Sequence, residues 1–417
     1  NQMIFIFYIL TVLLIFLSYK SFRGGIDYLK YFKSELAKQP SNFMPFASII
    51  APCKGLDEGL EENLLALLEQ DYSEYEVIFV VDDENDPAVA VIEELMNCRD
   101  AEAQRNKGSD SASLRLCGEK ARLAIAPKTI DSSQKVENLR EAVLRVSNES
   151  AVLVFVDSDA RPTKDWLRRL IAPLADENIG STTGYRWFIS PRPNFASEMR
   201  SAWNASIASA LGPNRKGNFC WGGSTAIRRE TFDKLNIRDK WQGVLSDDFA
   251  LTKAVKVAGL DIHFVPHALI ASVESCTFRE MLEFTTRQMK ITRVYAPHLW
   301  KLSLFGSSLF TVVMLAAFAI AIFSKQNDFR VIAAIVTIIL VSFFSIGKSW
   351  LRLNAASLVL NQYSHDLRKQ FLPQNTFWLL TPPLFFYNSL AALFSRRMTW
   401  RGLRYELVSP NETRRLP

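Results

Sequence analysis

The segment AVLVFVDSDARPTKDWL, residues 151–167, places two carboxylates directly behind a run of apolar residues. The run at residues 151–156 predicts a central strand of a parallel sheet, buried on both faces. Asp157 and Asp159 follow it with one residue between them, so an extended backbone would point both side chains the same way. Two neighbouring carboxylates repel each other, and keeping both ionised requires a nearby cation.

The residues around this segment predict alternating strands and helices. Strands are expected at residues 46–55 and 121–127 and within residues 75–88, where the strand ends in acids. Helices are expected at 60–70, 89–97 and 135–146, and a polar loop at 99–118. Such strand–helix–strand units form right-handed crossovers between parallel strands, and ligands bind beyond the carboxyl ends of those strands. Asp82 and Asp83 also stand at a strand end. The pattern therefore predicts a nucleotide-binding α/β sheet.

Glycine-rich phosphate-binding loops are absent from the sequence, which contains neither GxGxxG nor GxxxxGK[ST]. Phosphates would then be held by basic side chains and by a divalent cation bound through carboxylate oxygens. This requirement favours Asp157 and Asp159 as a metal site. A second interpretation is that Pro162 opens a helix, with Asp159 as its N-terminal cap.

Apolar residues make up 48% of the 417 residues and are concentrated at the two ends of the chain. The stretch at residues 3–19 is about long enough to cross a bilayer, and it is expected to be an anchor because it lacks the features of a cleaved signal peptide. Further spans are expected at residues 304–323 and 331–347, and near 377–394, where Pro382 and Pro383 interrupt the stretch. The expected organisation is an anchor (1–20), a juxtamembrane linker (21–45), a soluble domain ending in an interfacial helix (46–300), and a membrane region with a basic tail (301–417).

The distribution of charge predicts the orientation of these segments. Lys20, Arg23, Lys30 and Lys33 follow the first span, which places the soluble domain on the cytoplasmic side. Four full crossings would leave the C-terminal arginines outside, so residues 377–394 are expected to be re-entrant or interfacial. The five cysteines show no CxxC pairing, which fits a reducing compartment and argues against a disulfide framework or a zinc site. No nucleic-acid partner is expected.

Four motifs stand in a fixed order along the chain. The acids after the second strand, DSD at residues 157–159, SDDFAL at 246–251 and RQMKITR at 287–293 resemble the D, DxD, (E/D)D and (Q/R)xxRW series of membrane-anchored inverting glycosyltransferases. The resemblance, which covers residues 46–297, is to the ceramide glucosyltransferase group, family 21. It implies a GT-A-type α/β fold with a mixed, mostly parallel sheet and transmembrane helices at both ends.

The resemblance also implies roles on the donor side. Asp83 would contact the uridine or ribose of a nucleotide sugar, and Asp159 would be the direct ligand of a Mg²⁺ or Mn²⁺ ion with Asp157 beside it. The implied nucleotide-sugar site comprises Pro52, Lys54, Asp82, Asp83, Lys135, Asn138, Asp157, Arg287, Gln288, Lys290 and Arg293.

On the acceptor side, the resemblance implies Asp248 as the general base and Asp247 as its support. A helix N-terminal cap is the alternative for this pair. Trp221, Gly222, Gly223 and Ser224 would form a wall beside the acceptor, and a packed β-turn is the equally plausible alternative for them.

The last motif departs from the family pattern. Lys290 stands where arginine is usual and Ile291 where tryptophan is usual, while Arg287 keeps the first position. Lysine retains the positive charge but lacks the planar guanidinium that can bind a phosphate through two nitrogens. Arg293 would supply that group instead. A basic amphipathic helix lying on lipid headgroups is the other interpretation, and it is compatible with the first.

The resemblance implies a single inverting displacement. It would move a hexose, with glucose as the expected sugar, from a UDP-sugar to the hydroxyl of a bilayer lipid such as ceramide or diacylglycerol. One base suffices because the leaving group is already stabilised. Two other functions stay open at this point, a processive polysaccharide synthase and a non-catalytic membrane scaffold with a degenerate transferase domain.

Overall fold

Residues 2–105, 120–324 and 328–417 are described by the computed structural model of this chain. They divide into two units, which are described separately. The sheet unit comprises Glu35–Arg192, Ala210–Ser275 and Thr399–Pro417, and the helical unit comprises Asn1–Ser34, Pro193–Ser209 and Cys276–Met398.

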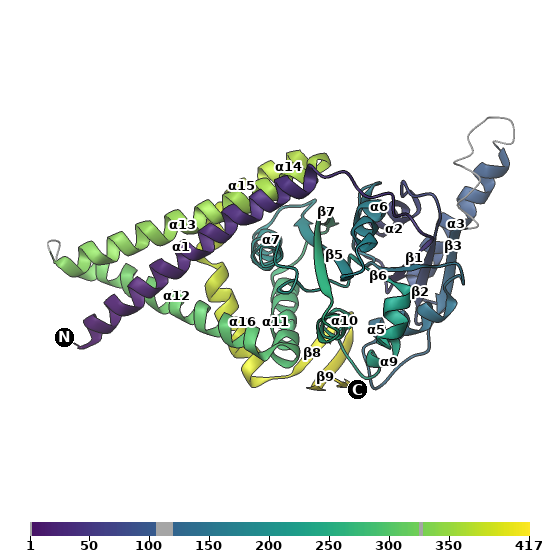
Figure 1. Cartoon of the computed structure of the whole chain (residues 1–417). Coiled ribbons are helices and arrows are strands. Elements are labelled where there is room, and N and C mark those ends of the chain that lie inside the picture. The colour runs from purple at the N-terminus through teal and green to yellow at the C-terminus, as the bar shows by residue number, and fades with distance from the viewer. Residues whose placement is uncertain (1, 106–119, 325–327) are drawn as a thin grey trace. The chain divides into compact units, whose positions relative to one another are not determined.

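A seven-stranded sheet in the order β3-β2-β1-β4-β6-β5-β7 forms the centre of the sheet unit (Figure 1). Its strands are β1 (Ala47–Pro52), β2 (Tyr75–Val81), β3 (Ala121–Ile125), β4 (Val152–Phe155), β5 (Ile179–Ile189), β6 (Thr225–Arg228) and β7 (Asp261–Val273). The first four strands pair in parallel, as do β5 and β7, whereas β6 runs antiparallel to both of its neighbours. The mixed, mostly parallel sheet confirms the predicted fold class.

The helices of this unit lie between the strands. They are α2 (Leu60–Leu68), α3 (Pro87–Arg105), α5 (Gln134–Ala142), α6 (Trp166–Ile171), α8 (Arg229–Lys234), α9 (Ile237–Lys240) and α10 (Asp247–Val257). Helices α2, α3 and α5 are the three that the sequence predicts. Helix α3 extends beyond its predicted end, so residues 99–105 of the predicted loop are helical, and most of that loop lies outside the described residues.

The prediction that Pro162 opens a helix is wrong, and with it the interpretation of Asp159 as a cap. Helix α6 begins only at Trp166. The backbone before it is held by a bridge to β7, in which the N–H of Arg161 donates to the carbonyl of Ala271 over 3.0 Å. This pairing keeps the chain extended where a helix would otherwise start.

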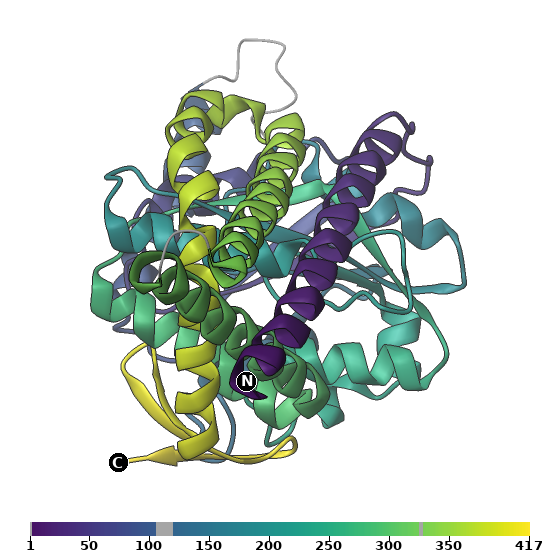
Figure 2. The ribbon, with the colours of Figure 1, turned by 90° about the vertical axis from the view of Figure 1, so that its left-hand side faces the viewer.

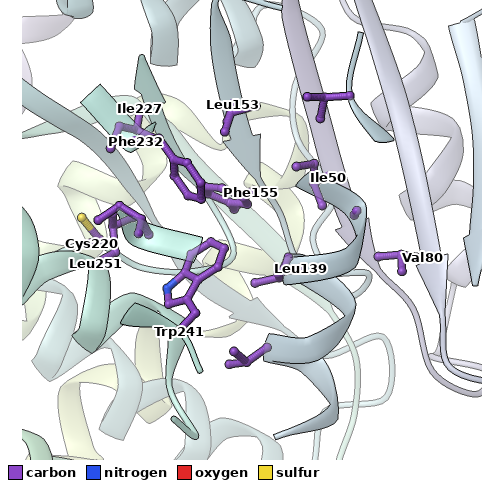
Figure 3. Packing of buried hydrophobic residues seen from close by; sticks show 14 of the residues in the cluster. Ile50, Val80, Leu139, Leu153, Phe155, Cys220, Ile227, Phe232, Trp241 and Leu251 are labelled. Carbon is purple, nitrogen blue, oxygen red and sulfur yellow. The ribbon is translucent and has the colours of Figure 1, made fainter. Parts of the chain in front are cut away.

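The core of the sheet unit fills the space between one face of the sheet and helices α5 and α10 (Figure 3). Trp241 is fully buried there, with its ring edge-on to Phe155 at 5.2 Å and to Phe232 at 5.4 Å. Its indole N–H donates to the carbonyl of Asp247 over 3.1 Å. The packing of the core therefore fixes the first turn of α10, where two predicted site residues lie.

The helical unit is built around long apolar helices. Its elements are α1 (Gln2–Leu36, whose last residues fall in the sheet unit), α7 (Phe195–Ala208), α11 (Phe278–Tyr295), α12 (Pro297–Phe323), α13 (Phe329–Val359), α14 (Ser364–Lys369), α15 (Phe371–Thr376) and α16 (Thr381–Phe394). Within the described residues, three helices are long and apolar enough to cross a membrane, namely α1, α12 and α13. Figure 2 shows these three helices, which share one apolar cluster that includes Leu14, Phe310 and Val341.

The segment with the double proline is bent, as expected for a re-entrant or broken span. Phe371–Leu379 and Thr381–Phe394 meet at 59°. Pro382 and Pro383 lie in the first turn of α16, where proline is tolerated because the amides there have no partner inside the helix.

Three predicted boundaries need correction. The expected linker at residues 21–45 is helical as far as Leu36, because α1 continues through it. The expected domain at 46–300 loses α7 and α11 to the helical unit, where Trp203 of α7 stacks on Phe385 of α16 at 4.7 Å. The expected basic tail is folded: β9 (Leu403–Ser409) and β10 (Glu412–Leu416) pair and belong to the sheet unit, while β8 (Arg397–Trp400) leads into them.

Replacing Trp241 with alanine should destabilise the sheet unit by about 3–5 kcal/mol, because a fully buried aromatic leaves a cavity and an orphaned carbonyl. The change is measured by urea unfolding of the purified protein, followed by far-ultraviolet circular dichroism. Val257→Ala is the control, since Val257 is 80% exposed and its truncation should cost within about 0.5 kcal/mol. Equal stability of the two variants would contradict the assignment of Trp241 to the core.

Candidate active site

The carboxyl ends of β1, β2 and β4 lie side by side at one edge of the sheet. The parallel register pairs Pro52 of β1 with Val80 of β2, and Ile50 of β1 with Phe155 of β4. The residues that follow these three ends include Lys54, the acids at 82 and 83, and the DSD segment. The sheet topology therefore brings Lys54 and two of the four predicted motifs to one edge.

Two cations hold the carboxylates of the DSD segment. Arg186, on β5, donates to Asp157 and to Asp159 over 3.0 Å each. Lys135, in the first turn of α5, lies 2.7 Å from the other oxygen of Asp157. The two like charges therefore lie side by side because the guanidinium of Arg186 bridges them. The same guanidinium lies over the ring of Trp221, 4.7 Å from the ring centroid, in a cation–π contact.

These contacts keep Asp157 ionised. Burial acts to raise its pKa, but the charges of Lys135 and Arg186 outweigh burial, so the pKa lies below its ordinary value. Burial likewise opposes the charged form of Lys135, yet Asp157 and Asp247 raise the pKa of its ammonium group above the ordinary value. The cluster is thus charged at neutral pH although its side chains are largely buried.

The acidic pair of the third motif opens helix α10. Ser246 is the N-cap, and its hydroxyl accepts a hydrogen bond from the N–H of Phe249, so neither acid is the cap residue. Asp247 is buried and its carboxylate lies 3.3 Å from Lys135. Asp248 accepts a hydrogen bond from the Ser246 hydroxyl and is less buried. Lys135 thus joins the DSD carboxylates to the third motif.

The two acids of this pair have different environments. Burial raises the pKa of Asp247 to about 6, and Lys135 only partly offsets the burial, while the charges of Asp248 and Asp157 act in the same direction as burial. Asp247 therefore holds its proton to a higher pH than an ordinary carboxyl does.

The acids after β2 are also paired with lysines. Asp82 lies 2.9 Å from Lys54, and Asp83 lies 2.6 Å from Lys128. The hydrogen bond from Lys128, followed by that from the backbone N–H of Asn85, lowers the pKa of Asp83 to about 2. Asp83 is therefore ionised and accessible.

A residue from the C-terminal hairpin connects the two groups of acids. Arg401 forms an ion pair with Asp57, one of its nitrogens lying 2.9 Å from Oδ2, and it also contacts the carbonyl of Lys54. Asp57 in turn accepts a hydrogen bond of 2.8 Å from Ser158, the residue between the two DSD acids. Polar contacts thus run without a break from Asp82 to the DSD segment.

The C-terminal segment is held in this place by several further contacts. The hydroxyl of Tyr405 accepts a hydrogen bond from the N–H of Gln134, and the N–H of Arg415 donates to the carbonyl of Ile130 over 2.9 Å. Arg401 and Gly402 both have positive φ angles, of 50° and 75°, which turn the chain tightly before β9. The arginine is therefore presented at the tip of an anchored hairpin.

The turn before β6 closes the cluster on one side, and it has the packed β-turn geometry of the second interpretation. The N–H of Ser224 donates to the carbonyl of Trp221 in a β-turn. A Cβ on Gly222 would lie 2.3 Å from Asp247 Oδ2, and one on Gly223 would lie 2.8 Å from Asp157 Oδ2. Only glycine lets the backbone approach the acids this closely.

Two of the predicted contact residues are buried and serve to position others. Ser224 is fully buried and accepts a hydrogen bond from the indole of Trp166 over 2.9 Å, while its contact with an acceptor stays a prediction. Asn138 is 2% exposed, and its side chain bonds to Gln134 and to the carbonyl of Val80. Its contacts fix the loop that leads to Lys135.

The residues predicted from the fourth motif belong to the helical unit, on α11. Lys290 donates to the carbonyl of Arg397, and Arg293 donates to the carbonyl of Leu393 over 2.9 Å. Both cations therefore satisfy carbonyls at or just beyond the C-terminal end of α16. Arg287 lies over the ring of Phe284 at 5.5 Å, and Gln288 lies one position further along the same helix.

Three residues of the site were missed from the sequence, namely Arg186, Asp57 and Arg401. Arg186 lies within the residues that the family resemblance covers, and a lone charged residue in the otherwise uncharged strand β5 was an available signal. Arg401 carried no such signal, because it is separated from Asp57 by 344 residues.

The DSD carboxylates fit a divalent cation that is shared with a substrate. Asp159 Oδ1 is buried and has no hydrogen-bond partner in the structure. No group of three His, Cys, Asp or Glu side chains suited to a metal occurs in the part of the chain that the structure describes. Magnesium, however, commonly takes only one or two protein carboxylates and completes its shell with water and substrate phosphates. The donor set agrees with that mode of binding.

The raised pKa of Asp247 predicts a pH-dependent effect of Asp247→Asn. The unfolded chain releases this proton near the ordinary value of 3.8, whereas the folded chain holds it up to about 6. Native stability therefore falls as the pH rises between these values, and a variant without the proton avoids that loss. We expect the stability of Asp247→Asn relative to the native protein to increase from pH 4 to pH 6 and then to level off. Thermal unfolding across that range measures the difference, and Asp239→Asn, at an exposed position on α9, should show no such trend.

Known proteins resemble this chain to different degrees. Ceramide glucosyltransferase 1 of Caenorhabditis elegans is 20% identical over 263 residues, 63% of this chain and 53% of that protein. An N-acetylglucosaminyltransferase of Rhizobium leguminosarum bv. viciae is 26% identical over 247 residues, 56% of this chain and 52% of that protein. The chain thus spans about half the length of the curated relatives it matches.

A solved structure and a family profile complete the comparison. The mannosyltransferase PcManGT from Pyrobaculum calidifontis, in complex with GDP-Man and Mn²⁺, aligns with a TM-score of 0.43 and 18% identity over 91% of this chain and 99% of that chain. The profile of glycosyl transferase family 21 matches residues 9–104 and 115–413. Because that match extends over most of the sequence, the chain belongs to glycosyl transferase family 21.

Proposed function

We propose that this glycosyltransferase moves a hexose from a UDP-sugar to the hydroxyl of a membrane lipid, with inversion at the anomeric carbon. The observation that carries the proposal is the cluster in which Lys135 joins Asp157 to Asp247 while Arg186 bridges Asp157 and Asp159. Family membership and the apolar helices support the choice of a sugar donor and a lipid acceptor.

The donor would lie along the carboxyl edge of the sheet. Asp83, ionised and accessible, would accept hydrogen bonds from the ribose, and the diphosphate would lie near Arg401 and the DSD segment. Asp159 and Asp157 would hold a Mg²⁺ or Mn²⁺ ion, which when bound neutralises charge on the departing diphosphate. Arg401 is suited to the same negative charge, because its guanidinium reaches this edge from outside the sheet.

Asp248 would take the proton of the acceptor hydroxyl. It is more accessible than Asp247, and its carboxylate is already oriented by the Ser246 hydroxyl and the N–H of Phe249. The ion pair between Asp247 and Lys135 would hold the start of α10 next to the DSD segment. The distance between the base and the donor sugar would then stay fixed. The hydroxyl oxygen then attacks the anomeric carbon opposite the leaving diphosphate, and one displacement inverts that carbon.

The acceptor is proposed to be a bilayer lipid such as ceramide or diacylglycerol, reached from the cytoplasmic face. Three helices of membrane-spanning length support a membrane location for the chain. The C. elegans relative is named a ceramide glucosyltransferase, which supports glucose and ceramide as the first sugar and lipid to test. The Rhizobium relative is named an N-acetylglucosaminyltransferase, so UDP-N-acetylglucosamine belongs in the same panel.

The test is a transfer assay with membranes that contain the protein, a panel of labelled UDP-sugars with or without Mn²⁺, and separation of the lipid products. We expect a labelled lipid from one sugar, and Asp248→Asn should retain donor binding while its turnover falls about a hundredfold to ten-thousandfold, because the proton acceptor is lost. Asp239→Asn is the matched control. Labelled polymer in place of lipid would favour a processive synthase, and donor binding without any transfer would favour a scaffold.

Arg401 provides a second test of the donor site. We expect Arg401→Gln to lower kcat/KM for the donor about tenfold to a hundredfold, because a charge-assisted contact to the diphosphate is worth about 1.5–3 kcal/mol. Arg404→Gln is the control, since Arg404 is exposed on the same hairpin and contacts the chain terminus. Wild-type kinetics in Arg401→Gln would exclude the hairpin from the donor site.

A further inference from the structure

A pocket of about 370 Å³ lies within the helical unit, apart from the acids described above. Its walls come from α1, α7, α12, α13, α15 and α16 and include apolar side chains such as Leu14, Leu17 and Phe310. Two cations of α13, Lys348 and Arg352, also line it. Nothing in the proposed transfer reaction uses these two residues.

Arg352 is buried in this pocket without a counter-ion. Its side chain is 5% exposed, and its Nε–H has no hydrogen-bond partner, while one terminal nitrogen contacts the hydroxyl of Ser349 at 3.4 Å. No ion pair within 4.0 Å involves Arg352 or Lys348 among the residues that the structure describes. A buried guanidinium with no carboxylate partner is costly, and a pocket beside it can admit a ligand that supplies the missing negative charge.

The rest of the pocket offers matching polar groups. Lys348 donates to the hydroxyl of Ser21 on α1 over 2.7 Å and keeps two further donors. Gln374, which is 1% exposed, also lines the pocket, and its Oε1 has no hydrogen-bond partner. An anionic phosphate with a neighbouring hydroxyl would pair with both the cations and this acceptor.

The depth of these cations along their helix agrees with a lipid headgroup. The distance from Phe329, where α13 begins, to Lys348 is about 30 Å at 1.5 Å per residue, close to the thickness of the hydrocarbon core. The cations would thus lie at the level of one membrane surface. The apolar side chains of α1 and α12 that line the pocket offer contacts for acyl chains next to the headgroup.

We propose that this pocket binds a phospholipid with an anionic, hydroxyl-bearing headgroup, its phosphate on Arg352 and Lys348 and its hydroxyl on Gln374. The lipid would supply the negative charge that the described part of the chain does not place beside the two cations. This binding does not depend on sugar transfer, so it can be measured even if the proposed activity is wrong.

The experiment titrates the purified full-length protein, in a neutral detergent, with phosphatidylglycerol, with phosphatidylcholine of the same acyl chains, and with inorganic phosphate. Native mass spectrometry measures the lipid-bound fraction and thermal unfolding measures protection. We expect phosphatidylglycerol to bind at least tenfold more tightly than phosphatidylcholine, and inorganic phosphate to give no comparable protection. Equal binding of the two lipids, or equal protection by free phosphate, would overturn the proposal.

Variants locate the binding in the pocket. Arg352→Gln should weaken phosphatidylglycerol binding about tenfold to a hundredfold and leave phosphatidylcholine binding unchanged, because the charge-assisted contact is lost. Lys348→Gln should act in the same direction, and it keeps the test decisive if the buried Arg352→Gln fails to fold. Lys20→Gln is the matched control, since Lys20 is an exposed cation on α1 one residue before Ser21. The site would be refuted if Lys348→Gln and a folded Arg352→Gln both bound phosphatidylglycerol with native affinity.

Discussion

The ion pairs that Lys135 and Arg186 make with Asp157 are the contacts on which the rest of this site depends. Bringing two carboxylates to one strand end costs free energy through repulsion and loss of water, and only cations placed at hydrogen-bond distance recover it. The same lysine contacts Asp247, so the strand end and the start of α10 share one cation. Because the cluster is largely buried, a change at any one of these positions would leave an uncompensated charge at the others.

The core and the active site are coupled through this arrangement. Trp241 packs against Phe155, the last residue of the strand that carries the DSD segment, and also bonds to the backbone of Asp247. One aromatic side chain therefore fixes the spacing between the donor-side acids and the start of α10. Glycines 222 and 223 complete this spacing, because a side chain at either position would collide with an acid. The geometry of the candidate site is thus a result of core packing.

The two units differ in how they handle isolated charge. In the sheet unit, Asp82 and Asp83 at the carboxyl edge each have a lysine beside them. Asp57 is paired with Arg401, which comes from the C-terminal hairpin. In the helical unit, Lys290 and Arg293 are satisfied by carbonyls near the end of α16. Arg352 contrasts with all of these, since its Nε–H has no partner and a pocket lies beside it. That contrast is what distinguishes a ligand site from a structural cation.

The sequence by itself determined the strands β1 to β4, the helices α2, α3 and α5, the acids at strand ends and the apolar helices, because these follow from local periodicity and from hydropathy. It also placed Asp157, Asp159 and Asp247 in one series of motifs. Only the tertiary structure decided which cations neutralise these acids, that Ser246 and not an acid caps α10, and that the C-terminal hairpin delivers Arg401. Pairing between residues far apart in sequence depends on chain topology, and no local pattern records it. For the same reason the pocket around Arg352, assembled from six helices, has no signature in the sequence.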